Sequence, residues 1–398
     1  MMTRSSKKVD KDELFNIHID RPDKSIYDEA KRKWDLLSKP LDGLGSFEGL
    51  ICRLAAMQKS PDIDISKRAA VIMIADNGIV EEGISQSGSE VTRAVGDALI
   101  KGISSANTLG RYAKTDIISV DVGIAGEVSA DAGNNMVSAL RNKDINNGKS
   151  EPLVTKDGLF YDKKVAFGTK NFLKKPAMSE QETLKAIISG IEVAYDLKEK
   201  GYKLLITGEM GIGNTTTSVA VLCSLLGLDA EVITGRGAGL SDAALKRKKE
   251  VIKIGIKKYC TDNEKYLHLK NDNERAFYIL SCLGGLDIAA LAGVFIGAAM
   301  NRLPVLIDGL ISSVAALIAE RMVAGVKEYY IASHKGREGG HAAALKELGL
   351  KAFIDADMAL GEGTGGIMAL PLIDMVLDFY NNASVFKDIK VNEYERLS

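Results

Sequence analysis

Two glutamates in glycine-rich turns are the side chains best suited to chemistry in this chain of 398 residues. Glu209 belongs to the segment 207–218 (TGEMGIGNTTTS), and Glu362 belongs to the segment 360–366 (LGEGTGG). Glycine neighbours leave a carboxylate little cover, and a dry pocket would raise its pKa until it became a usable base near neutral pH. The alternative for each is a solvated surface turn. That alternative is weaker for Glu362, since four glycines surround its single charge.

The segment that contains Glu209 also has the composition of an anion-binding turn. An apolar run with strand character, 202–206, precedes it, and a helical pattern follows from Val219. Glycines let the backbone approach a ligand, and the free N–H groups at a helix start attract an anion. The alternative is an ordinary tight turn between a strand and a helix, with Asn or Thr as the helix N-cap.

The expected phosphate site differs from the common nucleotide-binding loop. The segment lacks the Gly-Lys-Ser/Thr ending of a Walker A loop and contains no lysine. A reaction on a monophosphate fits better, with amides and hydroxyls on the phosphate, a lysine nearby and a carboxylate that removes a proton. Lys248 is the candidate lysine, although the basic run 246–249 is also typical of a solvated helix face. The four histidines form no close metal-binding pair, and we expect neither a metal ion nor a cofactor.

Composition limits the class of protein. The chain has 52 Lys and Arg against 53 Asp and Glu, and the net charge of −1 argues against broad nucleic-acid binding. Charged residues at 26% and hydrophobic residues at 46% are typical of a soluble globular protein. Four cysteines without a CxxC spacing favour buried thiols in a reducing, cytoplasmic compartment. Residues 1–13 carry charge but no apolar segment, so we expect neither a secretory signal nor a membrane anchor there.

Hydrophobic periodicity predicts a helical start followed by alternating strands and helices. Residues 12–58 have helical spacing, which is broken at 39–45. The predicted strands are 69–75, 116–120, 165–167, 202–206, 231–239 (a strand with a glycine loop), 304–307 and 329–332. The later predicted helices are 90–112, 180–198, a basic helix capped by Ser241 and Asp242, and 367–380. This alternation predicts an α/β fold, with a doubly wound, mostly parallel sheet and helices on both of its faces.

Polar residues follow five of the predicted strands, namely Asp76, Asp121, Glu209, Asp308 and His334. Ligands of parallel sheets bind beyond the carboxyl ends of the strands, so we expect these residues to share one polar crevice. The apolar stretch 278–300 approaches the length of a membrane span. Asp287 in its middle, among several glycines, favours a helix buried in the protein instead.

A series of motifs runs along the chain. They are Lys39-Pro40…Gly43-Leu44-Gly45, Ala75-Asp76-Asn77-Gly78, Val120-Asp121-Val122-Gly123, 208–216 (GEMGIGNTT), Gly284-Gly285-Leu286-Asp287, Leu306-Ile307-Asp308-Gly309, Ser333-His334 and 360–365 (LGEGTG). In these motifs, from about residue 39 to 370, the chain resembles the nicotinate-nucleotide–dimethylbenzimidazole phosphoribosyltransferase family of cobalamin synthesis. The GEMGIGNTT and LGEGTG segments together are highly specific to that family.

The resemblance implies a reaction in which nicotinate mononucleotide donates its 5-phosphoribosyl group to 5,6-dimethylbenzimidazole or a related base. Carbon C1′ inverts, and the products are an α-ribazole 5′-phosphate and nicotinate. The resemblance implies that Glu362 is the general base, which takes the proton of the attacking base. It implies that the following residues bind substrate: Glu209, Gly211, Gly213, Asn214, Thr215, Thr216, Lys248, Asp308, Ser312, Gly361, Gly363 and Ser87.

The resemblance also implies a homodimer. Each chain would have a catalytic domain, residues 61–369, and a small helical domain built from residues 1–60 and 370–398. The acceptor base stays open, because Val95 falls where relatives that use dimethylbenzimidazole often carry Gln. Adenine, another benzimidazole or a phenol would also fit. Two other functions are alternatives: a sensor that binds nicotinate mononucleotide but has no need of Glu362, and a phosphate-loop kinase or ATPase, against which the missing lysine argues.

Overall fold

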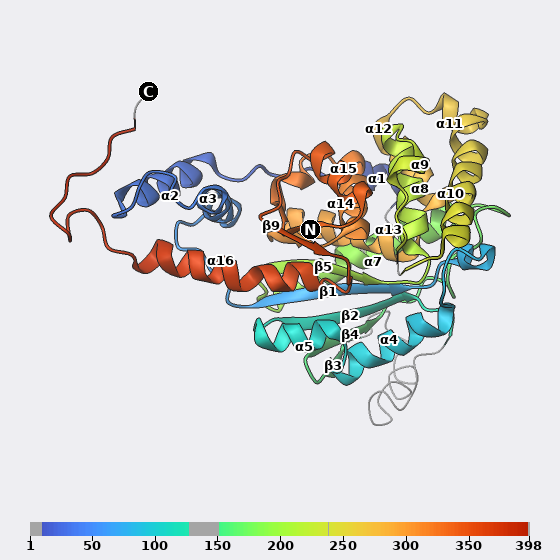
Figure 1. Ribbon diagram of the computed structural model, residues 1–398, viewed down its shortest axis with the longest axis horizontal. Coiled ribbons are helices and arrows are strands. Elements are labelled where there is room, and N and C mark those ends of the chain that lie inside the picture. The colour runs from blue at the N-terminus through green and yellow to red at the C-terminus, as the bar shows by residue number, and fades with distance from the viewer. Residues whose placement is uncertain (1–9, 127–150, 238, 397–398) are drawn as a thin grey trace.

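The computed structural model describes residues 10–126, 151–237 and 239–396 (Figure 1). Its main sheet has seven strands in the order β3-β4-β2-β1-β5-β6-β7. Neighbours run parallel, except for β3 and β4 at one edge. The strands are β1 (Arg68–Ala75), β2 (Asp116–Gly123), β3 (Leu153–Thr155), β4 (Gly158–Asp162), β5 (Leu204–Met210), β6 (Val305–Ile307) and β7 (Tyr330–Ala332). The chain order runs outward from β1 in both directions, so the ends of β1 and β5 form the switch point where ligands bind in such sheets.

The helices follow the strands in alternation. They are α1 (Lys11–Phe15), α2 (Lys24–Leu36), α3 (Ser46–Gln58), α4 (Ser89–Lys101), α5 (Ser105–Tyr112), α7 (Glu180–Glu199), α8 (Asn214–Leu226), α9 (Ala230–Ile233), α10 (Asp242–Ile256), α11 (Glu264–His268), α12 (Asp272–Leu283), α13 (Leu286–Met300), α14 (Leu310–Met322), α15 (Gly339–Glu347) and α16 (Thr364–Asn382). A second, short parallel sheet pairs β8 (His334–Gly336) with β9 (Ile354–Met358). The predicted α/β fold with a mostly parallel sheet is confirmed.

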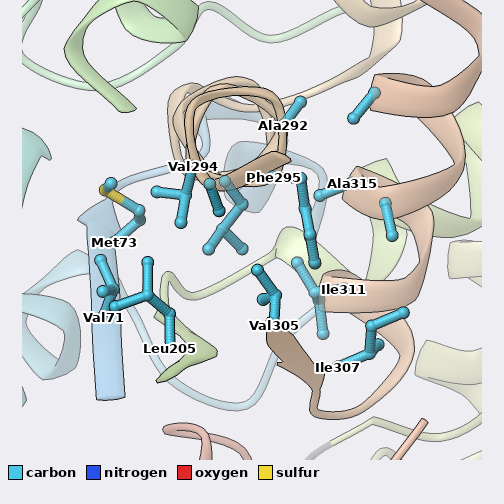
Figure 2. Packing of buried hydrophobic residues seen from close by; sticks show 14 of the residues in the cluster. Val71, Met73, Leu205, Ala292, Val294, Phe295, Val305, Ile307, Ile311 and Ala315 are labelled. Atoms are coloured by element: carbon cyan, nitrogen blue, oxygen red, sulfur yellow. The ribbon is translucent and has the colours of Figure 1, made fainter. Parts of the chain in front are cut away.

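Helices cover both faces of the main sheet, with α4 and α5 on one face and α7, α13 and α14 on the other (Figure 1). The centre of the second layer is α13, which is buried from Leu286 to Ala299. Figure 2 shows Val294 and Phe295 of α13 facing the sheet. The side chains that they face come from three strands: Val71 and Met73 of β1, Leu205 of β5 and Val305 of β6. The carboxyl ends of these strands are therefore held by a continuous apolar core.

Two glycines set the distance between α7 and α13. A Cβ atom at Gly190 would lie 1.9 Å from the carbonyl oxygen of Ala290, and one at Gly293 would lie 1.9 Å from that of Ile187. The two helix backbones therefore touch directly. The stretch 278–300 contains the end of α12 and all of α13, buried in protein. Among the described residues, no helix is both long and apolar enough to cross a membrane.

The two ends of the chain pack against each other. The rings of Trp34 in α2 and Tyr380 in α16 lie 5.1 Å apart between centroids. Leu37 forms a β-bridge with Val385. Figure 1 shows α16 running from the sheet to α2 and α3. Near its middle, α16 is attached to β1 by the ion pair between Asp374 and Arg68, whose closest N–O distance is 2.5 Å.

Two of the predicted strands are wrong. Residues 231–239 begin within helix α9 instead, because the Asp229 side chain accepts a hydrogen bond from the Glu231 N–H and caps the helix, despite the β-branched residues. Residues 165–167 form no strand; the strands of this region are β3 and β4. Asp157-Gly158 between them is a typical hairpin signal. Residues 127–150 of the predicted polar excursion lie outside the described residues.

Other boundaries shift. The predicted helix 90–112 is two helices, because Gly102 adopts a φ of +74° that ends α4, and Ser104 forms a capping box that starts α5. Residues 12–58 likewise form three helices, α1 to α3. Strand β5 extends to Met210, so Glu209 lies at a strand end and not within the glycine turn. Helix α8 already begins at Asn214.

We predict that Gly293→Ala lowers the stability of the protein, because the new methyl group would meet backbone atoms of α7 that cannot rotate away. We expect a decrease of about 1–3 kcal/mol in the free energy of unfolding, measured by urea denaturation. Gly49→Ala in α3 is the matched control, since its Cβ atom would meet only the Tyr27 hydroxyl at 3.9 Å. It should be neutral or stabilising, as alanine favours a helix. Equal effects of the two changes would contradict the role given to Gly293.

Candidate active site

The end of β5 touches the turn before α16 through backbone atoms. A Cβ atom at Gly208 would lie 2.7 Å from the nitrogen of Gly363 and 2.8 Å from the carbonyl carbon of Glu362. Only glycine at position 208 permits this approach. The contact brings the two glycine-flanked acids to one place, and a Cβ atom at Gly361 would lie 3.3 Å from Glu209 Oε1. The site lies at the carboxyl end of β5, next to the switch point of the sheet.

Glu209 is held by one amide and surrounded by other acids. Asn214 Nδ2 donates a hydrogen bond to Glu209 Oε2 and another, of 3.0 Å, to Asp287 Oδ2. Burial, first of all, raises the pKa of Glu209 from 4.5 to about 8, and the negative charges of Asp287, Asp308 and Glu362 contribute to this rise. Glu209 therefore keeps its proton at neutral pH in the empty protein and titrates in the mildly alkaline range.

The start of α8 is open to an anion. Its N-cap, Gly213, has a φ of +92° and supplies no side chain to cap the helix. Beside it, Lys248 of α10 is 1% exposed and donates a 2.9 Å hydrogen bond to Thr215 Oγ1. Burial lowers the pKa of Lys248 to about 8, and Glu338 partly opposes this shift. An ammonium group that is buried against a neutral hydroxyl is destabilised, and an anion at the helix start would relieve it.

The start of α16 is already filled. Asp308 follows β6, and its Oδ1 accepts hydrogen bonds from the N–H groups of Gly365 (2.8 Å) and Gly366 (3.2 Å). His334 lies beside this carboxylate, since a Cβ atom at Gly365 would come within 2.2 Å of its ring. Of the two helices that follow Glu209 and Glu362, α8 therefore offers its N-terminus to a ligand, whereas α16 binds an aspartate of the protein itself.

Glu362 occupies a strained backbone position. Its φ is +56°, and its neighbours Gly361 and Gly363 have φ values of +90° and +73°. A left-handed conformation is uncommon for a residue with a side chain and is often found at functional sites. Glu362 Oε2 accepts a 3.1 Å hydrogen bond from the backbone N–H of Ala106, in the first turn of α5. The carboxylate is thus oriented by a helix N-terminus, whose dipole favours its charge.

These groups share a cleft of about 660 Å³. The residues of the sequence prediction that line it are Glu209, Gly211, Asn214, Thr215, Asp308, Ser312, Gly361 and Glu362. Four others lie directly behind the wall: Gly213 and Gly363 as helix N-caps, Thr216 as a fully buried residue of α8, and Lys248 through its contact with Thr215. Ser87, in the loop before α4, lies outside this wall.

The prediction of one crevice for five strand-end residues is only partly right. Glu209, Asp308 and His334 line the cleft. Asp121 does not, because β2 continues to Gly123 and the carboxylate pairs with Lys164 at 2.9 Å. Asp76 also lies apart, and its Oδ2 accepts a 2.7 Å hydrogen bond from the Ala125 N–H. Asp76 and Asp121 therefore lie outside the cleft, at the ends of β1 and β2, where each binds another part of the protein.

Sequence reasoning missed the opposite wall of the cleft. It consists of the loop 234–237 together with residues around the start of α15, such as Glu338 and His341. His341 Nδ1 accepts a 2.9 Å hydrogen bond from the Gly336 N–H, and burial lowers the pKa of His341 to about 3. The glycines of the loop 234–237 were the sequence feature that could have indicated this wall. The connection of Asp287 to the site was missed as well, since nothing in local spacing points to Asn214.

We predict that Glu209→Gln becomes more stable than the wild type as the pH rises. The unfolded chain loses the Glu209 proton near 4.5, whereas the folded protein keeps it to about 8, so the wild type loses stability between these pH values. The difference in Tm between variant and wild type should grow from pH 5 to about 8 and then level off. Glu81→Gln is the control, because Lys174 lowers the pKa of Glu81 and places its titration below this window. A constant difference for Glu209→Gln would contradict the raised pKa.

Known proteins match this chain over nearly its whole length. A family model described as phosphoribosyltransferase matches residues 19–391. A nicotinate-nucleotide–dimethylbenzimidazole phosphoribosyltransferase of Acetivibrio thermocellus is 38% identical over 94% of this chain and 95% of its own. One of Clostridium perfringens is 37% identical over 93% of this chain and 92% of its own.

Solved structures give the same result. CobT from Thermus thermophilus superposes with a TM-score of 0.79, at 29% identity, and covers 93% of this chain and 100% of its own. A second structure from that organism, of a nicotinate-nucleotide–dimethylbenzimidazole phosphoribosyltransferase, has a TM-score of 0.78 at 30% identity, with 94% and 100% coverage. With the family model and the relatives matching nearly the whole length, the chain belongs to the nicotinate-nucleotide–dimethylbenzimidazole phosphoribosyltransferase family.

Proposed function

We propose that this protein transfers the 5-phosphoribosyl group of nicotinate mononucleotide to a ring nitrogen of a benzimidazole-type base. Nicotinate leaves, and the product is an α-ribazole 5′-phosphate for the nucleotide loop of cobalamin. The observation that carries this proposal is the pairing, in one cleft, of an open helix start beside buried Lys248 with two carboxylates, Glu209 and Glu362. The first arrangement suits a phosphate, and the second suits proton transfer next to a developing cation.

The donor phosphate would lie at the start of α8. The start of α8 and the Thr215 hydroxyl would supply donors there, and Lys248 would supply the positive charge. Glu209, at the end of β5, would then lie beside the ribose. The pyridinium nitrogen of the donor is positively charged, and its presence favours the ionised form of Glu209. An ionised carboxylate in that position stabilises the positive charge that develops at C1′ as nicotinate departs.

Glu362 would act as the general base. Its carboxylate is oriented by the Ala106 N–H. The turn that contains Glu362 contacts the end of β5 at Gly208. Removal of the N–H proton of the attacking imidazole ring leaves the product base neutral, so no second positive charge forms in the cleft. Both substrates are held in one cleft, which supplies the proximity that a bimolecular transfer needs.

We also infer that two chains associate through α16, in keeping with the homodimer that the resemblance implies. One face of this helix is apolar and exposed at helical spacing: Met368 (49%), Leu372 (37%), Met375 (67%) and Phe379 (39%). Such a stripe on a soluble protein is typical of an interface. A second copy suits it, because the stripe begins one turn after Glu362 and is continuous with the rim of the cleft at exposed Leu360. The packed chain ends 1–60 and 370–398 would form the small helical domain.

The transfer itself is tested by incubating the protein with nicotinate mononucleotide and a panel of acceptors. The panel contains 5,6-dimethylbenzimidazole, other benzimidazoles, adenine and phenols, and released nicotinate is measured. We expect release with at least one acceptor. Glu362→Gln should lower kcat by about 10²-fold or more while donor binding survives. Glu81→Gln, an exposed surface change, should match the wild type. Binding of the donor with no release for any acceptor would instead identify a sensor.

The association through α16 predicts that the protein in solution has twice the mass of one chain, measured by light scattering. Met375→Lys should produce single chains, because it places a charge in the centre of the stripe. Val154→Lys is the matched control, since Val154 is 76% exposed on β3, away from α16. A wild type that runs as a single chain, or a Met375→Lys variant that stays paired, would rule out this interface.

A further inference from the structure

We propose that Asp287 is a positioning residue for this reaction: through the amide of Asn214 it holds Glu209 in place and controls when that side chain gives up its proton. The inference rests on the proposed function, since it assigns the ionised form of Glu209 to the ribose of the donor. Asp287 itself is fully buried at the start of α13 and does not line the cleft. It would therefore act through Asn214 and Glu209, without touching either substrate.

One amide nitrogen joins the two carboxylates. Asn214 Nδ2 carries two hydrogens, and it donates one bond to Asp287 Oδ2 at 3.0 Å and another to Glu209 Oε2. The other oxygen of Asp287, Oδ1, accepts a 3.0 Å hydrogen bond from the Ile288 N–H within its own helix. The hydrogen bond within α13 uses only Oδ1. The second oxygen is directed out of α13, toward the start of α8 and the end of β5.

Two glycines leave room for the Asp287 carboxylate. A Cβ atom at Gly211 would lie 2.8 Å from Asp287 Oδ2, and one at Gly285 would lie 2.3 Å from Oδ1. The Asn77 amide fills the rest of this gap, at 3.1 Å and 2.5 Å from the same two positions. The carboxylate is thus enclosed by the turn after β5 on one side and the link between α12 and α13 on the other. Its position fixes the Asn214 amide, which in turn fixes Glu209.

Three acids face Glu209 from three elements. Asp287 faces it from α13, Asp308 from the link after β6, and Glu362 from the turn before α16, and Asp287 acts on it most strongly. Burial raises the pKa of Asp287 to about 6, below the value of about 8 for Glu209. Burial thus raises the pKa of both carboxylates, and the negative charge of Asp287 raises that of Glu209 further. Removal of the Asp287 charge would let Glu209 ionise at a lower pH.

The test is the pH profile of kcat/KM for nicotinate release between about pH 5.5 and 9.5. For the wild type we expect kcat/KM to rise with pH along a limb centred near 8, the pKa of free Glu209. Asp287→Asn keeps the size of the side chain and loses its charge, so its limb should lie about one unit lower. Glu209→Gln should have no such limb. Lys248 also has a pKa of about 8, so the profile of the wild type should be a narrow bell. All these variants share its falling limb, and they are compared by the position of the rising limb.

Two further variants separate positioning from a merely structural role. Asp76→Asn is the matched control, because Asp76 is a buried carboxylate that binds the Ala125 N–H and does not line the cleft. Its limb should coincide with that of the wild type. Asn214→Ala removes the donor that favours ionised Glu209, so its limb should move to higher pH. This variant carries the test if Asp287→Asn fails to fold.

The outcomes distinguish this inference from the proposed function. A folded Asp287→Asn variant whose limb does not move, or an Asn214→Ala limb that moves the same way as that of Asp287→Asn, would overturn the inference. If the wild type releases no nicotinate at any pH, the proposed function fails instead. The effect of Asp287 on Glu209 can then still be measured by Tm. The pH-dependent difference in Tm that Glu209→Gln produces should be smaller in a protein that carries Asp287→Asn than in the wild type. An unchanged difference would also overturn the inference.

Discussion

The end of β5 meets the turn before α16 without any side chain between them, because Gly208 and Gly363 bring their backbones into contact. Two strand ends that are far apart in the sequence thereby form one wall. Glu209 follows Gly208, and Glu362 precedes Gly363, so the contact places the two acids near each other. A methyl group at position 208 would push the two backbones apart and separate these acids. The apolar layer of α13 beneath the sheet keeps the strand ends in register, so the geometry is set by packing and not by the acids themselves.

The cleft is electrostatically divided. Its acids gather around the end of β5 and the start of α16, whereas its buried lysine lies at the open start of α8. Asp308 occupies the N-terminus of α16, whereas the start of α8 has no side-chain cap. In the proposed binding mode, a donor that carries a phosphate at one end and a cationic ring at the other would match this division in a single orientation. That orientation would turn C1′ toward the acids.

Much of the fold was predictable, and the sequence also pointed to two acids that the structure places in one cleft. Buried strands such as β1 and the long helix α7 have unmistakable periodicity, and glycines on both sides made Glu209 and Glu362 conspicuous. Helix α9 was not predictable from its β-branched residues, because the cap from Asp229 decided its conformation. The hydrogen bond between Asn214 and Asp287 spans 73 residues, and no local pattern encodes such a contact. Prediction therefore failed where tertiary contacts, and not local preference, determine the structure.

The burial of Lys248 has a consequence for how such a protein evolves. An ammonium group that is enclosed beside a neutral hydroxyl makes the folded protein less stable than a methionine of similar length would. A donor phosphate that binds there, as proposed, would restore folding free energy, so that the resistance of the protein to heat and proteolysis would depend on its own substrate. A screen for thermally stable variants that is carried out without the substrate would therefore favour replacement of this lysine. Such a screen would need to include the donor in order to retain it.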